Sequence, residues 1–444
     1  MSADPSSTVD TSRSAEIFDR ARRVLPGGVS RNTVLRKPHP AYADHGKGCR
    51  VTDIEGTTRI DFSNNMASLI HGHAFTPIIE AVTRQLERGS AFMMATESEV
   101  EYAEHLCSRS PVFEMARFVN SGTEALMVAL KASRAFTGRP RIAKVEGAYH
   151  GGYDYAEVSQ APKPENWGSV DRPNSVPLAH GTPASALNDV VIIPFNDIDH
   201  AIAILDEHAD DLACVLLDLM PHRVGLNPVE APFVKAIREW TRRNDALLVL
   251  DEVITFRAEY GGLHTRYGID ADIVAMGKAI GGGFPIGAIA GRAEVLDVMN
   301  MHGDRYVFPH SGTFSANPVS MVAGLEAMRH YDEAAVKGLL DLEQRAINGI
   351  REAAARTGAR ACVTGGGAMF RVHMKERPPL NFREAYLTPE DAARLKVLLE
   401  HLFDAGLVMI NTCTATLSTP MGESEIDTLV AAIGEGFEKI AKMP

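Results

Sequence analysis

The spacing of apolar residues changes about 76 residues into the chain, where two kinds of segment begin to alternate. Apolar residues recur at helical spacing in 77–88, 99–109 and 123–136. Short continuous apolar runs lie at 141–145, 213–219, 246–250, 273–276 and 286–290. Such runs, with helices between several of them, are typical of strands in a mainly parallel sheet that helices cover on both faces. We therefore predict an α/β domain in residues 76–330.

The chain before this domain has a different pattern. Residues 1–14 are polar and are expected to form a loose tail. A short amphipathic helix is predicted from Ala15 to Leu25, where Pro26-Gly27-Gly28 ends it. Alternating apolar and polar positions in 49–62 predict a hairpin. Residues 15–75 are therefore set apart as an N-terminal segment.

The chain after residue 330 is predicted to form a second, smaller α+β domain, residues 331–444. Its helical patterns are long, and short strand patterns separate them. The helices are expected at 334–356, 389–405 and 423–442. A segment rich in Pro, Ser, Asn and Gly, 160–189, is expected to be a long surface loop of the larger domain.

Composition narrows the class of protein. The 444 residues carry a formal net charge of −12, which argues against a general binder of nucleic acid or anionic membranes. The five cysteines lack CxxC spacing, as in proteins with reduced thiols rather than zinc sites or disulfides. Neither a secretory signal nor an apolar run of ~18 residues is found. We expect a cytoplasmic enzyme without metal, nucleic-acid or membrane partners.

Two apolar strand patterns end in charged residues, which is unusual. The run 247–250 leads into Asp251, and the run 273–276 is followed closely by Lys278. Residues two apart on a strand face the same side, so Asp251 and Val253 share a face. An aspartate can keep a pyridine nitrogen protonated, and a lysine can form an imine with an aldehyde and then act as a base, as pyridoxal-phosphate chemistry requires. By themselves the residues fit a buried Asp–Lys ion pair equally well.

Three further polar motifs are weak signals when each is taken alone. Asn120-Ser121-Gly122-Thr123-Glu124 opens a predicted helix and could bind an anion, although an ordinary N-cap has the same composition. Tyr149 lies between glycines in 147–152, so its ring could lie flat on a cofactor, or the segment is a tight surface turn. The stretch 310–314, with Ser311 and Thr313, could also bind phosphate.

Taken in this order, the four motifs resemble the class III aminotransferases of the fold-type I pyridoxal-phosphate enzymes. The branch that contains glutamate-1-semialdehyde aminomutase and the β-amino-acid aminotransferases is the most similar. The resemblance runs from about Leu25 to the C-terminus and is strongest at 251–255, 277–283 and 312–318. It implies a mainly parallel seven-stranded sheet in the large domain, and a small domain that residues 15–75 join.

The resemblance also implies roles for the residues around the cofactor ring. Lys278 would hold pyridoxal 5′-phosphate as a Schiff base, and Asp251 would bind the pyridine nitrogen. Tyr149 would stack on one face of the ring, with Val253 against the other face.

The cofactor's phosphate would be bound by residues from two subunits. Ser121, Gly122 and Thr123 would hold it from the same chain. Thr313 would reach the phosphate of the neighbouring subunit's cofactor, which implies a homodimer with active sites at its interface.

Substrate recognition is where the chain departs from its family. Arg31 falls where the β-amino-acid enzymes carry a carboxylate-binding arginine, and its guanidinium suits bidentate pairing. In the segment 218–225, Asp218 replaces the usual glutamate, and His222 or Arg223 replaces a small polar residue near the cofactor's phenolic oxygen. No arginine lies in 409–418, where many class III transaminases bind an α-carboxylate. Arg223 is a candidate for that role.

The function expected from the resemblance is amino transfer by a ping-pong mechanism. An amino acid or amine, such as a β-amino acid, would donate its amino group through Lys278, and a keto acid would then accept it. The alternatives are glutamate-1-semialdehyde 2,1-aminomutase or an amino-acid racemase on the same scaffold. A non-catalytic cofactor-binding protein is disfavoured, since such a protein would not need Lys278.

Overall fold

A computed structural model of the chain describes residues 12–443. Its central sheet has seven strands in the order β4-β10-β9-β8-β7-β5-β6. β10 runs antiparallel to β4 and β9, and the other neighbours are parallel, which confirms the predicted mainly parallel α/β sheet. The strands are β4 (Met115–Val119), β5 (Arg141–Val145), β6 (Val190–Ile193), β7 (Leu212–Leu217), β8 (Leu247–Asp251), β9 (Ile273–Gly277) and β10 (Gly287–Gly291).

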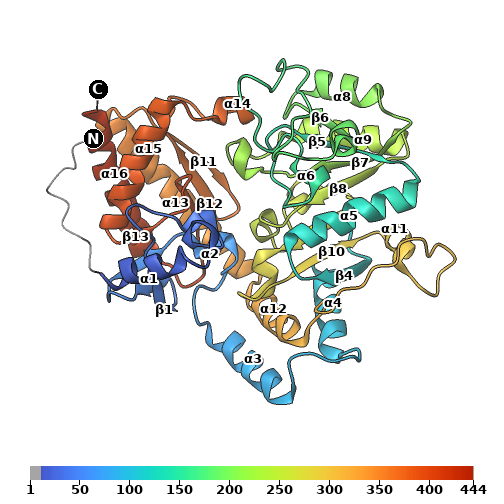
Figure 1. Cartoon of the computed structure of the whole chain (residues 1–444), viewed down its shortest axis with the longest axis horizontal. Helices are drawn as coiled ribbons and strands as arrows, with labels where there is room; N and C mark the ends of the chain where they lie inside the picture. Colours follow the sequence, from blue (N-terminus) through green and yellow to red (C-terminus); the bar gives the residue numbers. More distant parts are fainter. Residues whose placement is uncertain (1–11, 444) are drawn as a thin grey trace.

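Helices cover both faces of this sheet, which is why its strands are apolar along their whole length. On β8, for example, Leu247 and Val249 pack in the same apolar cluster as α5, whereas Leu248 and Leu250 belong to the cluster on the other face. Figure 1 shows α5 lying across the sheet. The helices of this region are α3 (Thr76–Arg88), α4 (Glu97–Arg109), α5 (Gly122–Thr137), α6 (Asp154–Glu157), α7 (Ala184–Asn188), α8 (Ile198–Asp206), α9 (Ala231–Arg243), α10 (His264–Tyr267), α11 (Ala293–Leu296) and α12 (Pro318–His330).

The second lobe, at the left of Figure 1, joins both ends of the chain. Its sheets have the orders β1-β2-β3-β13 and β11-β12-β14, and β3 pairs with β13 in parallel. Its elements are α1 (Arg13–Ala21), β1 (Ala43–Lys47), β2 (Arg50–Asp53), β3 (Thr58–Asp61), α2 (Asn64–Ala67), α13 (Glu333–Thr357), β11 (Cys362–Gly366), β12 (Met369–His373), α14 (Phe382–Ala385), α15 (Pro389–Asp404), β13 (Leu407–Val408), β14 (Thr414–Thr416) and α16 (Glu423–Ala441).

Contacts between the N-terminal segment and the C-terminal helices hold this lobe together. Arg50 forms an ion pair with Glu425 of α16 at 3.0 Å. The guanidinium groups of Arg36 and Arg59 lie 3.7 and 4.0 Å from the ring centre of Phe403 on α15. These contacts join the N-terminal segment to the C-terminal helices. The domain boundaries near residues 75 and 330 stay a prediction.

Several boundaries differ from those expected. α1 begins at Arg13, inside the expected tail, because Ser12 caps it, and it ends at Ala21 rather than at Leu25. Residues 1–11, the rest of that tail, lie outside the described residues. β4 and β6, the two edge strands of the large sheet, were not predicted from the sequence. The expected loop 160–189 contains the short helix α7.

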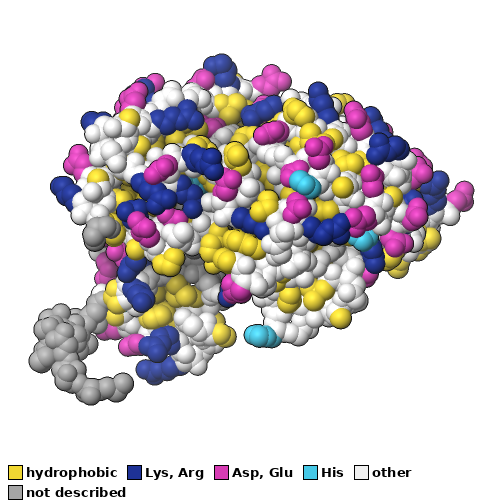
Figure 2. Space-filling view, turned by 90° about the horizontal axis from the view of Figure 1, so that it is seen from above, with side chains coloured by type: hydrophobic (Ala, Val, Ile, Leu, Met, Phe, Trp, Pro, Cys, Tyr) yellow, Lys and Arg dark blue, Asp and Glu magenta, His cyan; other side chains and the backbone are white. Residues whose placement is uncertain are grey.

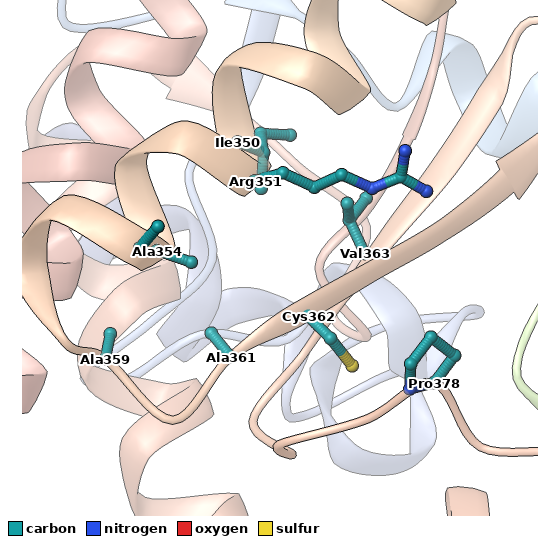
Figure 3. A pocket seen from close by; sticks show the side chains of 9 residues that line it. Ile350, Arg351, Ala354, Ala359, Ala361, Cys362, Val363 and Pro378 are labelled. Atoms are coloured by element: carbon teal, nitrogen blue, oxygen red, sulfur yellow. The ribbon is translucent and has the colours of Figure 1, made fainter.

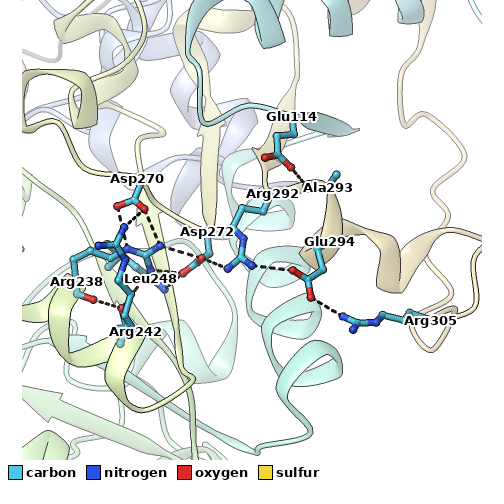
Figure 4. Close-up of polar contacts among 11 residues, drawn as sticks. Glu114, Arg238, Arg242, Leu248, Asp270, Asp272, Arg292, Ala293, Glu294 and Arg305 are labelled. Carbon is cyan, nitrogen blue, oxygen red and sulfur yellow. Dashed lines mark hydrogen bonds and ion pairs between the residues drawn. The ribbon is translucent and has the colours of Figure 1, made fainter.

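A buried aspartate organises the amino-terminal ends of β8 and β9 (Figure 4). Asp272 is 1% exposed, and its carboxylate accepts hydrogen bonds from the backbone N–H of Leu248 at 2.8 Å and from Arg238 at 2.6 Å. Arg292, before α11, donates to the same carboxylate at 2.7 Å. The buried charge of Asp272 is thereby paired with two guanidinium groups and a backbone N–H. The carboxyl ends of the same strands carry the site.

The outer surface mixes both signs of charge. Figure 2 shows Lys and Arg side chains interspersed with Asp and Glu over the face seen from above. No helix among residues 12–443 has the length and apolar character needed to cross a lipid bilayer.

Candidate active site

A cavity of about 380 Å³ lies at the carboxyl ends of β8 and β9, against the N-terminus of α5. It is the place where α/β sheets of this kind bind ligands. The cavity brings together eight of the ten residues singled out from the sequence, namely Arg31, Ser121, Gly122, Thr123, Tyr149, Asp251, Val253 and Lys278.

Neither of two other hollows is lined by Lys278 or Asp251. One of about 320 Å³ lies between α13 and β11, and Figure 3 shows that several of its lining side chains are small or apolar. Another of about 860 Å³ is lined by the segment 308–315, which includes Thr313. Thr313 therefore lies outside the cavity of its own chain.

Asp251, at the end of β8, is buried and bound from two sides. Its Oδ2 lies 2.8 Å from Nδ1 of His150, and its Oδ1 accepts a hydrogen bond from the backbone N–H of Val253 at 3.0 Å. Burial lowers the pKa of His150, against the effect of the hydrogen bond to Asp251. A neutral His150 must carry its proton on Nδ1 to donate to an ionised Asp251.

Glu252 points away from the cavity, as strand geometry requires. Its carboxylate accepts hydrogen bonds from the backbone N–H groups of Leu263 and His264 at 2.9 and 2.7 Å. His264 Nδ1 lies 3.0 Å from the same carboxylate. The alternation along β8 thus separates a residue of the cavity, Asp251, from a residue that anchors a loop.

Lys278 follows β9 in a left-handed conformation, with φ of 49°. That region costs a non-glycine residue roughly 1 kcal/mol, and such strain is concentrated at functional sites. No hydrogen bond engages its amine within residues 12–443, so the amine is available to a ligand. Burial lowers the pKa of Lys278, against the opposing charges of Asp251 and Asp218, which favours the neutral, nucleophilic amine.

A second buried lysine has a different role. Lys144 Nζ donates to the carbonyl oxygens of Ala148, Ala156 and Val158 at 3.0, 2.8 and 2.7 Å, which uses all three of its protons. Burial lowers the pKa of Lys144 to about 7. Lys144 fixes the loop that carries Tyr149.

The N-terminus of α5 is shaped to receive an anion. Ser121 caps the helix through its Oγ, which accepts from the backbone N–H of Glu124 at 3.1 Å. Gly122 packs so closely on Val253 that a Cβ there would lie 2.7 Å from Val253 Cγ1. Thr123 Oγ1 accepts from the backbone N–H of Gly152 at 3.2 Å. Free N–H groups and the helix dipole at such a terminus attract phosphate.

Tyr149 projects from the adjoining loop and is 47% exposed. The loop approaches α5 closely, because Gly151 has φ of +87° and a Cβ there would lie 2.6 Å from Thr123 Oγ1. A half-exposed ring that lines the same cavity as Val253 can stack on a planar ligand.

Arg31 reaches the cavity from the N-terminal segment, where its Nη1 donates to Asn65 Oδ1 at 2.6 Å. Asn65 belongs to α2, a single turn in which all four residues, Asn64–Ala67, have left-handed φ values between 45° and 70°. Such a turn costs roughly 1–2 kcal/mol per residue. The hydrogen bond from Asn64 Nδ2 to the carbonyl oxygen of Thr416, at 2.7 Å, helps to hold it.

Arg223 does not line the cavity. Its Nη1 donates to the carbonyl oxygen of Gln160 at 3.4 Å. His222 Nε2 lies 3.2 Å from the hydroxyl oxygens of Thr412 and Thr414. Asp218 does line the cavity, and burial, followed by the charge of Asp251, raises its pKa well above its ordinary value.

Sequence reasoning missed two residues of this site. His150 stood inside the motif 147–152, and its place beside Tyr149 was a usable signal. For Asn65, the pair Asn64-Asn65 was the one signal in the sequence. Asparagine tolerates a left-handed backbone better than most residues.

The residues present fit pyridoxal phosphate. Asp251 lines the cavity, the N-terminus of α5 offers groups that can bind an anion, and Tyr149 and Val253 can contact a planar ring. Lys278 supplies an unengaged amine. The fold and this set define a fold-type I pyridoxal-phosphate transferase.

Comparison with known proteins gives the family. A family model described as Aminotransferase class-III matches residues 33–421, so the chain belongs to the class III aminotransferases. Its cofactor is pyridoxal 5′-phosphate.

The relatives fall into two functional groups. Glutamate-1-semialdehyde 2,1-aminomutase of Methanothermobacter thermautotrophicus is 38% identical over 84% of this chain and 86% of its own. Among solved structures, an omega-transaminase from Sphaerobacter thermophilus has a TM-score of 0.95 and 44% identity, over 98% of this chain and 99% of its own. A β-phenylalanine aminotransferase from Variovorax paradoxus has a TM-score of 0.84 and 30% identity, over 95% of this chain and 93% of its own.

Proposed function

We propose that this class III enzyme is an aminotransferase whose amino donor carries a carboxylate, such as a β-amino acid, and whose acceptor is a keto acid. The observation that carries the proposal is the position of Arg31, held by Asn65 at the rim of the cavity that Lys278 and Asp251 line. A guanidinium there can pair with a carboxylate that lies away from the reacting carbon.

The roles of the site residues follow from their positions. Bound pyridoxal phosphate supplies an electron sink for the bond that breaks beside the amino group. Asp251 would keep a proton on the pyridine nitrogen, and His150 would hold Asp251 in place. Lys278 would move a proton at the substrate carbon, for which its lowered pKa is suited.

A second candidate is glutamate-1-semialdehyde 2,1-aminomutase. The Methanothermobacter thermautotrophicus relative described above carries this name and favours it over the aminotransferase. The omega-transaminase, which shares more residues with this chain over more of its length, supports the aminotransferase instead.

Product stoichiometry separates the two functions. With a β-amino acid and no acceptor, an aminotransferase releases about one keto product per site and then stops. With glutamate-1-semialdehyde alone, an aminomutase produces many equivalents of the isomer in which the amino group has moved from carbon 2 to carbon 1. Multiple turnovers of glutamate-1-semialdehyde, with no keto product from any amino donor, would refute our proposal.

We also propose a homodimer. Met93, Met94 and Phe314 are 105%, 78% and 56% exposed, which is unusual for large apolar side chains. The segment of Thr313 lines the hollow beside Phe314, where a second copy could pack. Light scattering coupled to gel filtration would give twice the chain mass if this is correct.

We also propose that the protein is cytoplasmic. All five cysteines are unpaired, which suits the reducing cytoplasm.

A further inference from the structure

An arginine on the short helix α14 joins the second lobe to two segments of the lobe that contains the central sheet. Figure 1 shows α14 near the top, between the two lobes. The Nε and Nη2 of Arg383 donate to the carboxylate of Glu146, directly after β5, at 2.9 and 3.0 Å. Its Nη groups also donate to the carbonyl oxygens of Trp167, Gly168 and Ser169 at 2.8, 2.8 and 2.7 Å. One guanidinium therefore binds both segments at once.

Apolar contacts accompany this pairing. The ring of Phe382 packs against Gly147, where φ is +77° and a side chain would collide with the ring. The Cζ of Arg383 lies 4.9 Å from the ring centre of Trp167, and the ring centre of Tyr386 lies 5.7 Å from the same indole. Residues on both sides of Arg383 thus pack against the neighbouring lobe, so the contact involves all of α14 and not one side chain alone.

The loop that receives these contacts leads to the cofactor cavity. Tyr149, which lines the cavity, stands three residues after Glu146. From inside its own lobe, Lys144 binds this loop through the carbonyl oxygen of Ala148, at 3.0 Å. From the second lobe, Arg383 binds it through the carboxylate of Glu146. The loop of Tyr149 is therefore held from both lobes, and one of the two supports belongs to α14.

The pair of Arg383 with Glu146 is largely removed from water. The two side chains are 10% and 8% exposed. Burial raises the pKa of Glu146, whereas the hydrogen bonds and the charge of Arg383 act to lower it. Removing one partner of such a pair leaves an uncompensated charge, which is strongly destabilising. Without Arg383, Glu146 would have to turn toward water and draw the loop of Tyr149 with it, or take up a proton.

We propose that Arg383 is a positioning residue for the cofactor, which sets the place of the Tyr149 ring through Glu146. The second lobe, by way of α14, thereby holds the stacking residue of a cavity that lies in the other lobe. Arg383 does not line this cavity itself, so its effect on the cofactor passes through the loop. The inference rests on the proposed stacking of Tyr149 and holds for an aminotransferase and an aminomutase alike.

Cofactor affinity and the visible circular dichroism of the holoenzyme test this role without turnover. The dichroism of a bound cofactor reports how the groups of the protein are arranged around it. Arg383→Gln should lower the dichroism and weaken pyridoxal-phosphate binding by about 3- to 10-fold, within the value of one aromatic contact. Arg383→Lys, which keeps the charge and part of the hydrogen bonding, should retain more of both. Arg345→Gln is the matched control, because it breaks a bidentate pair with Asp427 inside the second lobe and should change neither.

Tyr149→Ala separates an effect through the ring from a general loss of structure. In the Tyr149→Ala background, Arg383→Gln should weaken cofactor binding no further, because the ring that it positions is gone. Equal losses in the two backgrounds overturn the positioning role, as do wild-type affinity and dichroism in Arg383→Gln. If Tyr149→Ala itself binds the cofactor as the wild type does, the stacking role of Tyr149 is refuted, and the inference with it.

Tryptophan fluorescence of the holoenzyme checks the contact itself. The chain has two tryptophans and Trp240 is 1% exposed, so quenching by acrylamide chiefly reports Trp167. Quenching should increase in Arg383→Gln, whose side chain no longer covers the indole, and should stay at the wild-type level in Arg345→Gln. Unchanged quenching in Arg383→Gln would show that α14 does not hold the neighbouring lobe through Arg383, and would overturn the proposal.

Discussion

His150 Nδ1 lies 2.8 Å from Asp251 Oδ2, and both side chains are buried at the carboxyl edge of the central sheet. The histidine thereby holds the carboxylate that we propose would bind the pyridine nitrogen. The residue that follows Asp251 points the other way, to His264, so one strand serves the cavity with one carboxylate and anchors a loop with the next.

The first prediction concerns this pair. Asp251→Asn removes the charge that would hold a proton on the ring nitrogen, so kcat/KM should fall by about 10²-fold or more. His150→Gln loses one charged hydrogen bond and should lower kcat/KM by about 10-fold. His264→Gln is the matched control, which should change the unfolding temperature and leave kcat/KM near the wild-type value. A larger loss in His150→Gln than in Asp251→Asn would contradict the assignment.

The second prediction concerns the packing of α5 on β8. Gly122→Ala would place a methyl group 2.7 Å from Val253 Cγ1, and the stiff valine cannot move aside cheaply. The affinity for pyridoxal phosphate, measured by cofactor titration of the apoenzyme, should fall by about 10-fold.

Two variants check this explanation. Gly338→Ala, on α13 with open space around the new Cβ, should bind the cofactor normally. Adding Val253→Ala to Gly122→Ala removes the clash and should restore part of the affinity. No rescue in the double variant would show that crowding is not the cause.

The third prediction concerns the donor's carboxylate. Arg31→Lys keeps the charge but loses the bidentate fork, and Asn65→Ala frees the guanidinium from its 2.6 Å hydrogen bond. Both should raise the KM for a β-amino acid, by about 10-fold for the lysine variant. The KM for an amine without a carboxylate should stay unchanged. Equal effects on both donors would exclude a carboxylate-binding role for Arg31.

The fourth prediction concerns stability and pH. Burial raises the pKa of Glu343 to about 7, from about 4.3 in an unfolded chain. The folded state thus binds this proton more tightly, and the stabilisation that results is present below pH 4 and is lost as the pH rises to 7. Glu343→Gln keeps an acceptor for the backbone N–H of Ala368 and carries no charge.

Thermal unfolding of Glu343→Gln at several pH values checks this. The unfolding temperature of the variant minus that of the wild type should rise by about 2 °C or more between pH 5 and pH 8. The exposed Glu352→Gln should show no such trend. A difference that is constant with pH would show that Glu343 does not titrate in this range.

The sequence predicted the parts of the fold that local pattern determines. The strand 141–145 was predicted with its observed bounds, and the runs at 246–250 and 273–276 were placed within one residue of β8 and β9, because helices cover both faces and leave the strands continuously apolar. The edge strands β4 and β6 were missed. β4 carries the polar Arg117 among its five residues, and β6 begins directly after the segment 160–189 that was expected to be a loop.

Some residues of the candidate site could likewise be predicted from local pattern, and others could not. Asp251, Lys278 and the start of α5 lie at strand or helix ends, where polar residues after apolar runs are visible in the sequence. The pairing of Arg31 with Asn65 depends on a left-handed turn, and the contact of His150 with Asp251 joins residues 101 positions apart. Contacts of that kind follow from tertiary packing, which no local pattern encodes.

The covalent bond that we assign to Lys278 can be located chemically in the holoenzyme. The holoenzyme would be reduced with borohydride, digested and analysed by mass spectrometry, with Lys278→Ala as the control. We expect one pyridoxyl-phosphate label per chain, on Lys278, and none in the variant. A label on another lysine, such as the buried Lys144, or a label that persists in Lys278→Ala, would contradict the assignment.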